Sequence, residues 1–341
     1  MVQHTAAPDL GSLPDALLVV ILKHLDQEER LKHAALVCKR FQQLCCGPEL
    51  AAELAVHIEG GERALPWARA LLAWLAQHGS AVADLELLIT PGSIASAEEQ
   101  QECAALVAAA LTACSGPSCR LQKLQLHEGT PLETTSWLHA MSALEFLDVG
   151  SEDRPLLLHS WDGLSKLDSA ALCGAPVQLP AALPATLTCL YLCDKGTPEL
   201  PPQVTQLSSL RRLALERCTY SPASLDSLAS LAPSLTFLRL EECGPAPSLS
   251  CLTALRHLWL GSVPAPQLSS WMSRSGSCSS SHHLCTLSAI LADNPAEEEG
   301  SAALRLLDDL MWLRTQRPDV KVFRYCAAGH PDDSFMDYFN P

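Results

Sequence analysis

The side chains best suited to hold a metal ion lie in the serine-rich stretch SRSGSCSSSHHLC. Cys278, His282, His283 and Cys285 bring together thiols and imidazoles, the ligands that Zn²⁺ prefers. Their spacing resembles zinc ligation only loosely, and no CxxC pair occurs in the sequence. We therefore expect a flexible loop at this position, and no bound metal or cofactor.

Nucleophilic catalysis would need an activated cysteine or serine. Cys38, Cys45 and Cys46 lie in an apolar helical segment, an environment that disfavours the reactive thiolate. No GxSxG, HExxH, phosphate-binding glycine loop or dinucleotide fingerprint occurs. We predict that the protein is not an enzyme and that its 15 cysteines are reduced and mostly buried thiols.

The charge balance limits the possible partners. Asp and Glu number 38 against 23 Lys and Arg, which disfavours nucleic acid and anionic membranes and favours basic or neutral proteins. No apolar run reaches the roughly 18 residues that span a bilayer, and the start MVQHTAAPDL does not resemble a secretory signal. We expect an intracellular protein, in the cytoplasm, the nucleus or both.

Most of the chain follows a repeating LxxLxL pattern. Seven matches begin at Leu121, Leu144, Leu167, Leu187, Leu210, Leu235 and Leu255. Successive starts are 23, 23, 20, 23, 25 and 20 residues apart, within the period of leucine-rich repeats. Each unit should form a short strand whose leucines are buried only when neighbouring units stack. Cys218 and Cys243 occupy the Cys or Asn position of this repeat pattern.

Other segments flank this array. An earlier unit is expected at VADLEL, after an amphipathic helix over residues 62–78, and Ser96 with Glu99 should cap a helix that ends near Cys114. After the Leu255 unit the array should end in a closing helix, SAALRLLDDLMWLRTQRP, and a closing strand, DVKVFRY. The acidic tail HPDDSFMDYFNP should be poorly ordered unless it is bound.

The stretch LPDALLVVILKHL, Leu13 to Leu25, predicts a helix that is apolar on nearly every side. Asp26 and Glu29 can form a capping box for the next helix, and a further short helix should end at Gly47-Pro48. Such a small helical unit needs a neighbour or a partner for stability. A second surface must therefore cover the far side of the first helix.

Residues 12–45, with their LP start, HLD break and ALVCKRF segment, resemble the F-box motif, and leucine-rich repeats are its usual companion. The resemblance implies a substrate-recognition subunit of an SCF-type cullin-RING ubiquitin ligase. In that family the F-box binds a Skp-type adaptor, and through it a cullin. By motif position the implied adaptor contacts are Leu13, Pro14, Leu17, Ile21, Leu22, Leu25, Leu36, Val37, Cys38 and Phe41. Sequence does not separate core residues from contact residues within this set.

The repeats should bind the protein to be ubiquitinated on their concave face, where the variable positions of LxxLxL point. Tyr, Trp and Arg often dominate interface energies. The candidate substrate patch is Tyr191, Arg212, Phe237, Arg239, His257 and Trp259. Its mixed charge does not indicate the sign of the substrate, and scattered surface residues with no common target are the alternative interpretation.

The predicted fold is α/β: a three-helix F-box followed by a leucine-rich-repeat solenoid with a parallel row of strands. The expected boundaries are 10–50 for the F-box, 51–79 for a linking helix, 80–326 for the solenoid with its cap, and 327–341 for the acidic tail. One alternative is a repeat scaffold unrelated to a ligase, in which the N-terminal helices only cap the array. Another is a small-molecule sensor, which an open arc of short repeats disfavours.

Overall fold

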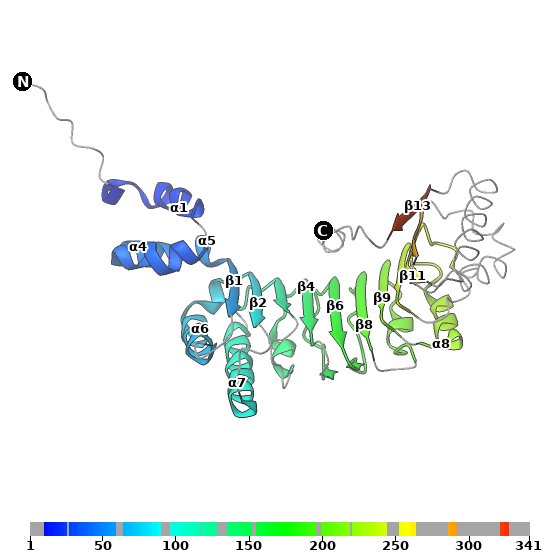
Figure 1. Cartoon of the computed structure of the whole chain (residues 1–341). Helices are drawn as coiled ribbons and strands as arrows, with labels where there is room; N and C mark the ends of the chain where they lie inside the picture. The colour runs from blue at the N-terminus through cyan, green and yellow to red at the C-terminus, as the bar shows by residue number, and fades with distance from the viewer. Residues whose placement is uncertain are drawn as a thin grey trace, which may run out of the picture. The chain divides into compact units, whose positions relative to one another are not determined.

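A computed structural model of the chain describes residues 10–25, 27–58, 64–89, 96–116, 118–127, 135–151, 155–195, 199–218, 220–243, 252–263, 286–291 and 321–326. The chain divides into two compact units. The first comprises residues 1–133 and 140–144, and the second comprises 134–139 and 145–341. Each unit is described by itself, and Figure 1 labels their elements.

The first unit begins with a group of short helices. They are η1 (Leu10–Ser12), α1 (Asp15–Lys23), α2 (Gln27–Glu29), the π-helical η2 (Arg30–Ala34), α3 (Ala35–Val37), α4 (Lys39–Cys45) and α5 (Pro48–Ala51). Their common core contains Val19, Leu22, Ala34, Cys45 and Leu50. The expected helical region is therefore present. Asp26 of the predicted capping box lies outside the described residues.

The rest of this unit combines parallel strands with two long helices. The elements are β1 (Glu53–Ile58), α6 (Ala64–His78), η3 (Gly79–Ala81), β2 (Asp84–Ile89), α7 (Ala97–Cys114) and β3 (Lys123–Leu126). The strands pair in the order β1-β2-β3. The Ser96 cap is confirmed, because the Glu99 N–H donates to Ser96 Oγ at 3.2 Å. Strand β1 was not anticipated, since ELAVHI lacks the LxxLxL pattern.

The second unit is built on a row of parallel strands. Its strands are β4 (Phe146–Gly150), β6 (Ser169–Gly174), β8 (Cys189–Asp194), β9 (Arg212–Glu216), β10 (Phe237–Glu241), β11 (His257–Val263), β12 (Thr286–Leu291) and β13 (Lys321–Cys326). They pair in this order, each parallel to the next. A second, two-stranded sheet pairs β5 (Leu156–Leu157) with β7 (Val177–Gln178).

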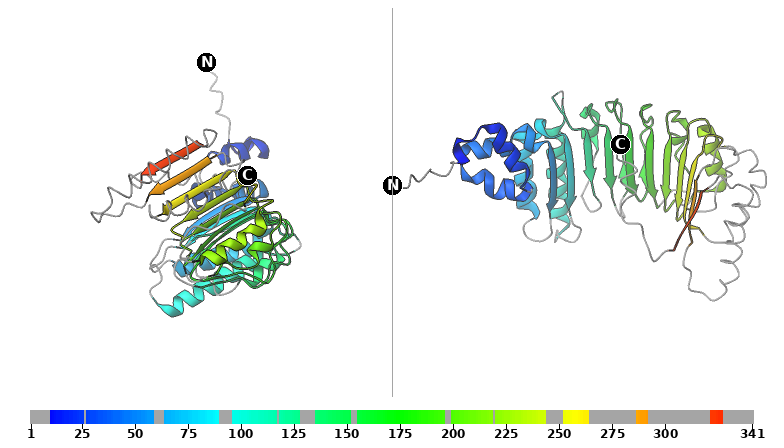
Figure 2. Two further views of the ribbon diagram at one scale, coloured as in Figure 1. Left: turned by 90° about the vertical axis from the view of Figure 1, so that its right-hand side faces the viewer. Right: turned by 90° about the horizontal axis from the view of Figure 1, so that it is seen from above.

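Within the described residues, the connections between strands of the main sheet in this unit contain short helical turns and no long helix. The described ones are η4 (Ser136–Ala140), η5 (Val204–Gln206), α8 (Pro222–Asp226) and η6 (Ser227–Leu231). The row of strands is seen from two further directions in Figure 2. One strand and one turn per repeat is the unit that the leucine period predicts.

The pattern leucines form the interior. In β10, for example, Leu238 and Leu240 are buried, whereas Phe237, Arg239 and Glu241 on the other face are partly exposed. Each of the seven predicted LxxLxL segments contains a strand, as does VADLEL, so the repeat prediction is confirmed. The closing strand is present as β13, and the predicted closing helix and acidic tail lie outside the described residues. Strand β12 was not anticipated.

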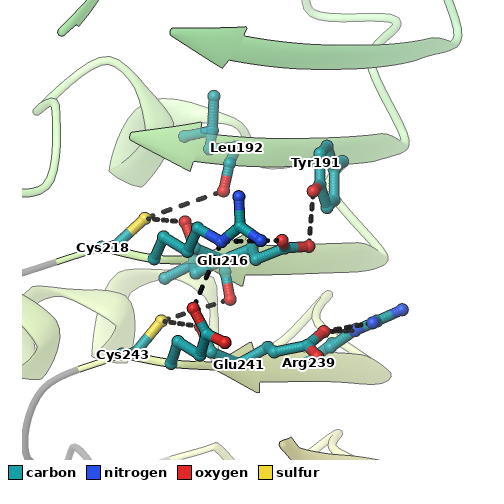
Figure 3. Close-up of polar contacts among 10 residues, drawn as sticks. Tyr191, Leu192, Glu216, Cys218, Arg239, Glu241 and Cys243 are labelled. Atoms are coloured by element: carbon teal, nitrogen blue, oxygen red, sulfur yellow. Dashed lines mark hydrogen bonds and ion pairs between the residues drawn. The ribbon is translucent and has the colours of Figure 1, made fainter. Parts of the chain in front are cut away.

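Cys218 and Cys243, at the Cys or Asn position of the repeat pattern, donate S–H hydrogen bonds to backbone carbonyls (Figure 3). Cys218 Sγ donates to the carbonyl of Leu192 at 3.7 Å, and Cys243 Sγ donates to that of Leu215 at 3.2 Å. Each thiol thus reaches a strand of the preceding repeat. The residues just before them, Arg217 and Glu242, both have left-handed backbone conformations, with φ of 53° and 48°. The two repeats therefore end their strands with the same turn.

The described cysteines are free thiols, and most of them are buried or partly buried. Burial raises the pKa of Cys45 and, to about 12, that of Cys114. Cys38 is exposed. The prediction of an apolar environment for Cys38 is therefore wrong, because this residue is the extended link between α3 and α4.

Candidate functional site

Helix α1 has two apolar faces. Leu18, Val19 and Leu22 are buried, whereas Leu17 and Ile21, together with Val20, leave 51%, 42% and 54% of their surface exposed. The buried face of this helix packs into the core of the helical group, which includes Val19 and Leu22. Its outer face is the uncovered surface that the sequence pattern predicted.

Helix α3 presents a further pair of exposed apolar side chains. Leu36 and Val37 are 78% and 69% exposed, the highest values among the large apolar side chains described in the chain. We call Leu17, Val20, Ile21, Leu36 and Val37 the exposed apolar set. Single exposed apolar side chains are common, but apolar side chains gathered on one surface are typical of protein-binding sites, and the five members of this set lie within 21 residues of the chain.

The remaining residues implied by the resemblance divide into several environments. Pro14 and Cys38 are exposed, Leu13 and Phe41 are partly buried, and Leu25 packs against the helical core. Leu22 lies within that core. Val20 was missed by the sequence analysis, although its position three residues after Leu17 places it on the same helix face.

Arg40 fixes the start of α1. Its guanidinium donates to Asp15 Oδ1 at 2.8 Å and 2.6 Å, and to the carbonyl of Leu13 at 2.6 Å. The segment Leu13-Pro14 is thereby held against α4, on the same short helix that carries Phe41. Arg40 was also missed, because nothing in the local sequence pairs it with a residue 25 positions earlier.

The second candidate surface is the face of the second unit's sheet opposite the leucines, which we call the open face. Strand register places the predicted patch on two adjacent rows. One row contains Arg212, Phe237 and His257 in direct succession, and the other contains Tyr191, Ala214, Arg239 and Trp259. The six predicted residues thus lie together on four neighbouring strands.

Polar contacts connect this patch (Figure 3). The Tyr191 hydroxyl donates to Glu216 Oε2 at 2.6 Å, and Arg239 Nε donates to Glu241 Oε2 at 3.0 Å. The Arg239 guanidinium also lies 4.0 Å from the centre of the Trp259 ring, a cation–π contact. Tyr191, Arg239 and Trp259 therefore each have a fixed neighbour, which lowers the entropy that binding through them would cost.

Acidic residues that the patch prediction did not include complete the network. Glu216 and Glu241 are opposite each other in register, and Arg217 Nε lies 3.2 Å from Glu242 and 3.6 Å from Glu216. Burial and the neighbouring Glu216 raise the pKa of the Tyr191 hydroxyl, which therefore stays protonated and donates. Side-chain pairs such as Tyr191 with Glu216 could not be predicted without the strand register, because the two residues are 25 positions apart in sequence.

Arg212 and His257 are the exposed members of the patch, and Phe237 between them is partly buried. Partial burial and the nearby Arg256 lower the pKa of His257, which favours the neutral imidazole at pH 7. The patch therefore presents the ring of Phe237 between the permanently charged guanidinium of Arg212 and the neutral imidazole of His257. This surface offers side chains for protein contact rather than a constellation for bond chemistry.

Metal binding and membrane insertion find no support in the described part of the chain. No group of three or more His, Cys, Asp or Glu side chains among the described residues could hold a metal ion. The cysteine and histidine cluster at 278–285 lies outside those residues. None of the described helices has the length and apolar character needed to cross a membrane.

Comparison with known proteins agrees with the helical region. Residues 10–56 match the F-box-like family model, so the chain contains an F-box-like domain followed by a parallel leucine-repeat sheet. F-box domains as a class bind Skp-type adaptors, and F-box and leucine-rich-repeat families are typically non-catalytic adaptors. No curated protein sequence matches the chain.

Solved structures with a similar arrangement include bacterial repeat proteins. A leucine-rich-repeat protein of Leptospira interrogans is 14% identical, with a TM-score of 0.28, over 73% of this chain and 68% of that one. An internalin of Listeria monocytogenes is 12% identical, with a TM-score of 0.33, over 78% of this chain and 90% of that one.

Proposed function

We propose that this protein is the substrate-recognition subunit of an SCF-type ubiquitin ligase. The F-box-like domain binds a Skp-type adaptor, and the adaptor connects the chain to a cullin. The open face of the repeat sheet binds the protein to be ubiquitinated. The observation that carries the proposal is the exposed apolar set, which lies within the residues that match the F-box-like family.

The adaptor contact in this proposal consists of the outer face of α1 and the exposed end of α3. Fully burying an apolar side chain of this size contributes about 1.5–3 kcal/mol, so covering the five members of the set with an adaptor favours binding. Leu13, Pro14, Cys38 and Phe41 border the contact, and Arg40 holds Leu13-Pro14 in place. Leu22 contributes to the interface only indirectly, by supporting α1 from inside.

The substrate contact in this proposal is the patch of Tyr191, Arg212, Phe237, Arg239, His257 and Trp259. Tyr191 is held by Glu216 and Arg239 by Glu241, so these two side chains are positioned before a substrate arrives. The chain itself performs no chemistry in this account. It raises the effective concentration of substrate lysines near the ubiquitin carried by the other subunits.

The experiment isolates the full-length chain from cells in which ubiquitin ligases of this class are inhibited, so that bound substrates accumulate. Three forms are compared: the wild type, a Leu36→Asp/Val37→Asp variant, and an Arg239→Ala/Trp259→Ala variant. The first variant should lose the adaptor and cullin but keep substrates. The second should keep the adaptor and lose substrates.

The contradicting results are equally specific. A wild-type chain that folds but binds no Skp-type adaptor overturns the ligase proposal and favours a repeat scaffold with a helical cap. A folded Arg239→Ala/Trp259→Ala variant with an unchanged set of bound proteins removes the patch from the proposal. Circular dichroism of the purified variants establishes that each is folded.

A further inference from the structure

Two cysteines of the open face lie directly opposite each other. Cys173 on β6 and Cys193 on β8 are register partners on adjacent parallel strands, which are labelled side by side in Figure 1. Opposite residues of neighbouring strands are about 4.8 Å apart. This spacing falls within the range of roughly 4.4–6.8 Å between Cα atoms that a disulfide bridges.

The neighbours of this pair make its two thiols unequal. On β4 the register partner of Cys173 is Gly150, which has no side chain, and on β9 the partner of Cys193 is Glu216. Cys173 is accordingly partly exposed, whereas only 1% of the surface of Cys193 is exposed. The partly exposed Cys173 is thus the member of the pair that a small reagent reaches directly, with Cys193 next to it.

The contact between the two thiols favours the thiolate form of Cys193. The hydrogen bond from Cys173 lowers the pKa of Cys193, and Arg217 and Lys195 act in the same direction, against burial and Glu216. Cys189, four residues earlier on the same strand, has the opposite setting. Burial raises its pKa to about 12, so it remains a thiol at neutral pH.

Cys218 and Cys243 form another neighbouring pair, whose thiols bond to the backbone. Cys218 and Cys243 donate their S–H groups to carbonyls of the strands around them. The hydrogen bond with Cys243, followed by burial, raises the pKa of Cys218, and the same bond lowers the pKa of Cys243. The thiols of Cys218 and Cys243 are thus engaged with backbone carbonyls, whereas Cys173 and Cys193, one repeat away, lie opposite each other on the open face.

We propose that Cys173 and Cys193 form a redox-active dithiol that hydrogen peroxide converts to an intrachain disulfide. The Cys193 thiolate attacks one peroxide oxygen, the O–O bond breaks, and the departing hydroxide takes up a proton to become water. Cys173 then loses its proton and its sulfur attacks the Cys193 sulfenic acid. The S–O bond breaks and a second water forms, so two thiols are oxidised by two electrons and one peroxide becomes two waters.

The site does not depend on the proposed ligase role, and it can be tested with the full-length chain alone. Reduced protein is treated with hydrogen peroxide, unfolded in iodoacetamide and digested with trypsin. The tryptic peptide Leu167–Lys195 contains Cys173, Cys189 and Cys193. We expect this peptide to lose two of its three alkylated positions and to regain them when the oxidised protein is reduced before alkylation.

Chymotryptic cleavage after Tyr191 separates Cys189 from Cys193 and identifies the linked pair. We expect Cys189 to stay alkylated, as should Cys218 in its own peptide. A Cys173→Ser variant should form no disulfide and leave Cys193 as a sulfenic acid that dimedone traps. Three alkylated cysteines in the wild type, at peroxide levels that oxidise free cysteine, would overturn the proposal, as would a link that includes Cys189.

Discussion

Arg40 and Asp15, 25 residues apart, join α4 to α1 through hydrogen bonds of 2.6 and 2.8 Å. The same guanidinium holds the carbonyl of Leu13. One side chain therefore fixes the entry into α1 relative to α4. In the proposed function it orients a proline and a leucine that border the adaptor contact.

Replacing Arg40 with Ala should weaken adaptor binding more than it weakens the fold. Both partners of the ion pair are partly exposed, so its contribution to stability is about 1 kcal/mol or less. Releasing Leu13-Pro14 should lower adaptor affinity roughly tenfold, about 1.4 kcal/mol. Isothermal titration calorimetry measures the affinity and urea unfolding the stability.

Lys39→Ala is the matched control, because Lys39 is the neighbouring exposed cation on the same helix. It should change neither quantity. An Arg40→Ala protein with wild-type affinity would show that the start of α1 needs no such restraint.

Leu22 and Leu36 should separate stability from binding. Leu22→Ala removes a buried side chain from the helical core and should cost about 2–5 kcal/mol of unfolding free energy. Leu36→Ala, at a position 78% exposed, should stay within about 0.5 kcal/mol of the wild type. Chemical unfolding followed by circular dichroism tests both, and equal effects would contradict the division into core and surface.

The division within LLVVIL illustrates what sequence could and could not predict. Six consecutive apolar residues required two buried or partnered faces, and the structure has three of them inside and three outside. Which three face inward depends on where α4 and α5 pack, and no local pattern carries that information. The strands of the repeats were predictable because LxxLxL combines the strand alternation with a fixed period.

Strand β1 shows the opposite case. ELAVHI follows α5 directly and pairs with β2 through its backbone, so its strand character comes from a neighbour and not from repeating leucines. The contacts within the patch likewise depend on how neighbouring strands pair. Arg239 meets Trp259 only because β10 and β11 pair in one particular register.

Gly163→Ala should destabilise the second unit strongly. A Cβ at this position would lie 1.8 Å from the carbonyl oxygen of His139, which belongs to the backbone and cannot rotate away. We expect a loss of about 3 kcal/mol or more in unfolding free energy. Urea unfolding monitored by circular dichroism measures it.

Gly116→Ala is the comparison for Gly163. Its φ of 125° is unfavourable for alanine, but no atom lies within 4 Å of the added Cβ. It should cost about 1–2 kcal/mol, the price of backbone strain alone. A Gly163→Ala protein as stable as the wild type would show that the turn around His139 is not tightly packed.

Stability should fall as the pH rises above about 9. Burial raises the pKa of Cys189 from 9.0 to about 12, so between these values the unfolded chain loses this proton while the folded chain keeps it. The unfolding free energy should then fall by about 1.4 kcal/mol per pH unit for this group. Burial shifts the pKa of Tyr220 upward, in the same direction.

Urea unfolding between pH 8 and pH 11 under reducing conditions gives the slope. Cys189→Ala should make the fall of the unfolding free energy with pH shallower by about 1.4 kcal/mol per pH unit, the contribution of one proton. A variant slope equal to that of the wild type would show that the Cys189 thiol is not buried in the folded protein.

The most direct test of the central claim is the affinity of the purified chain for a Skp-type adaptor, compared with that of Leu36→Asp/Val37→Asp. The account predicts a stable complex with the wild type and at least a hundredfold loss in the variant, about 2.7 kcal/mol, with unchanged circular dichroism. A folded wild type that does not bind the adaptor, or a folded variant that binds equally well, would contradict it.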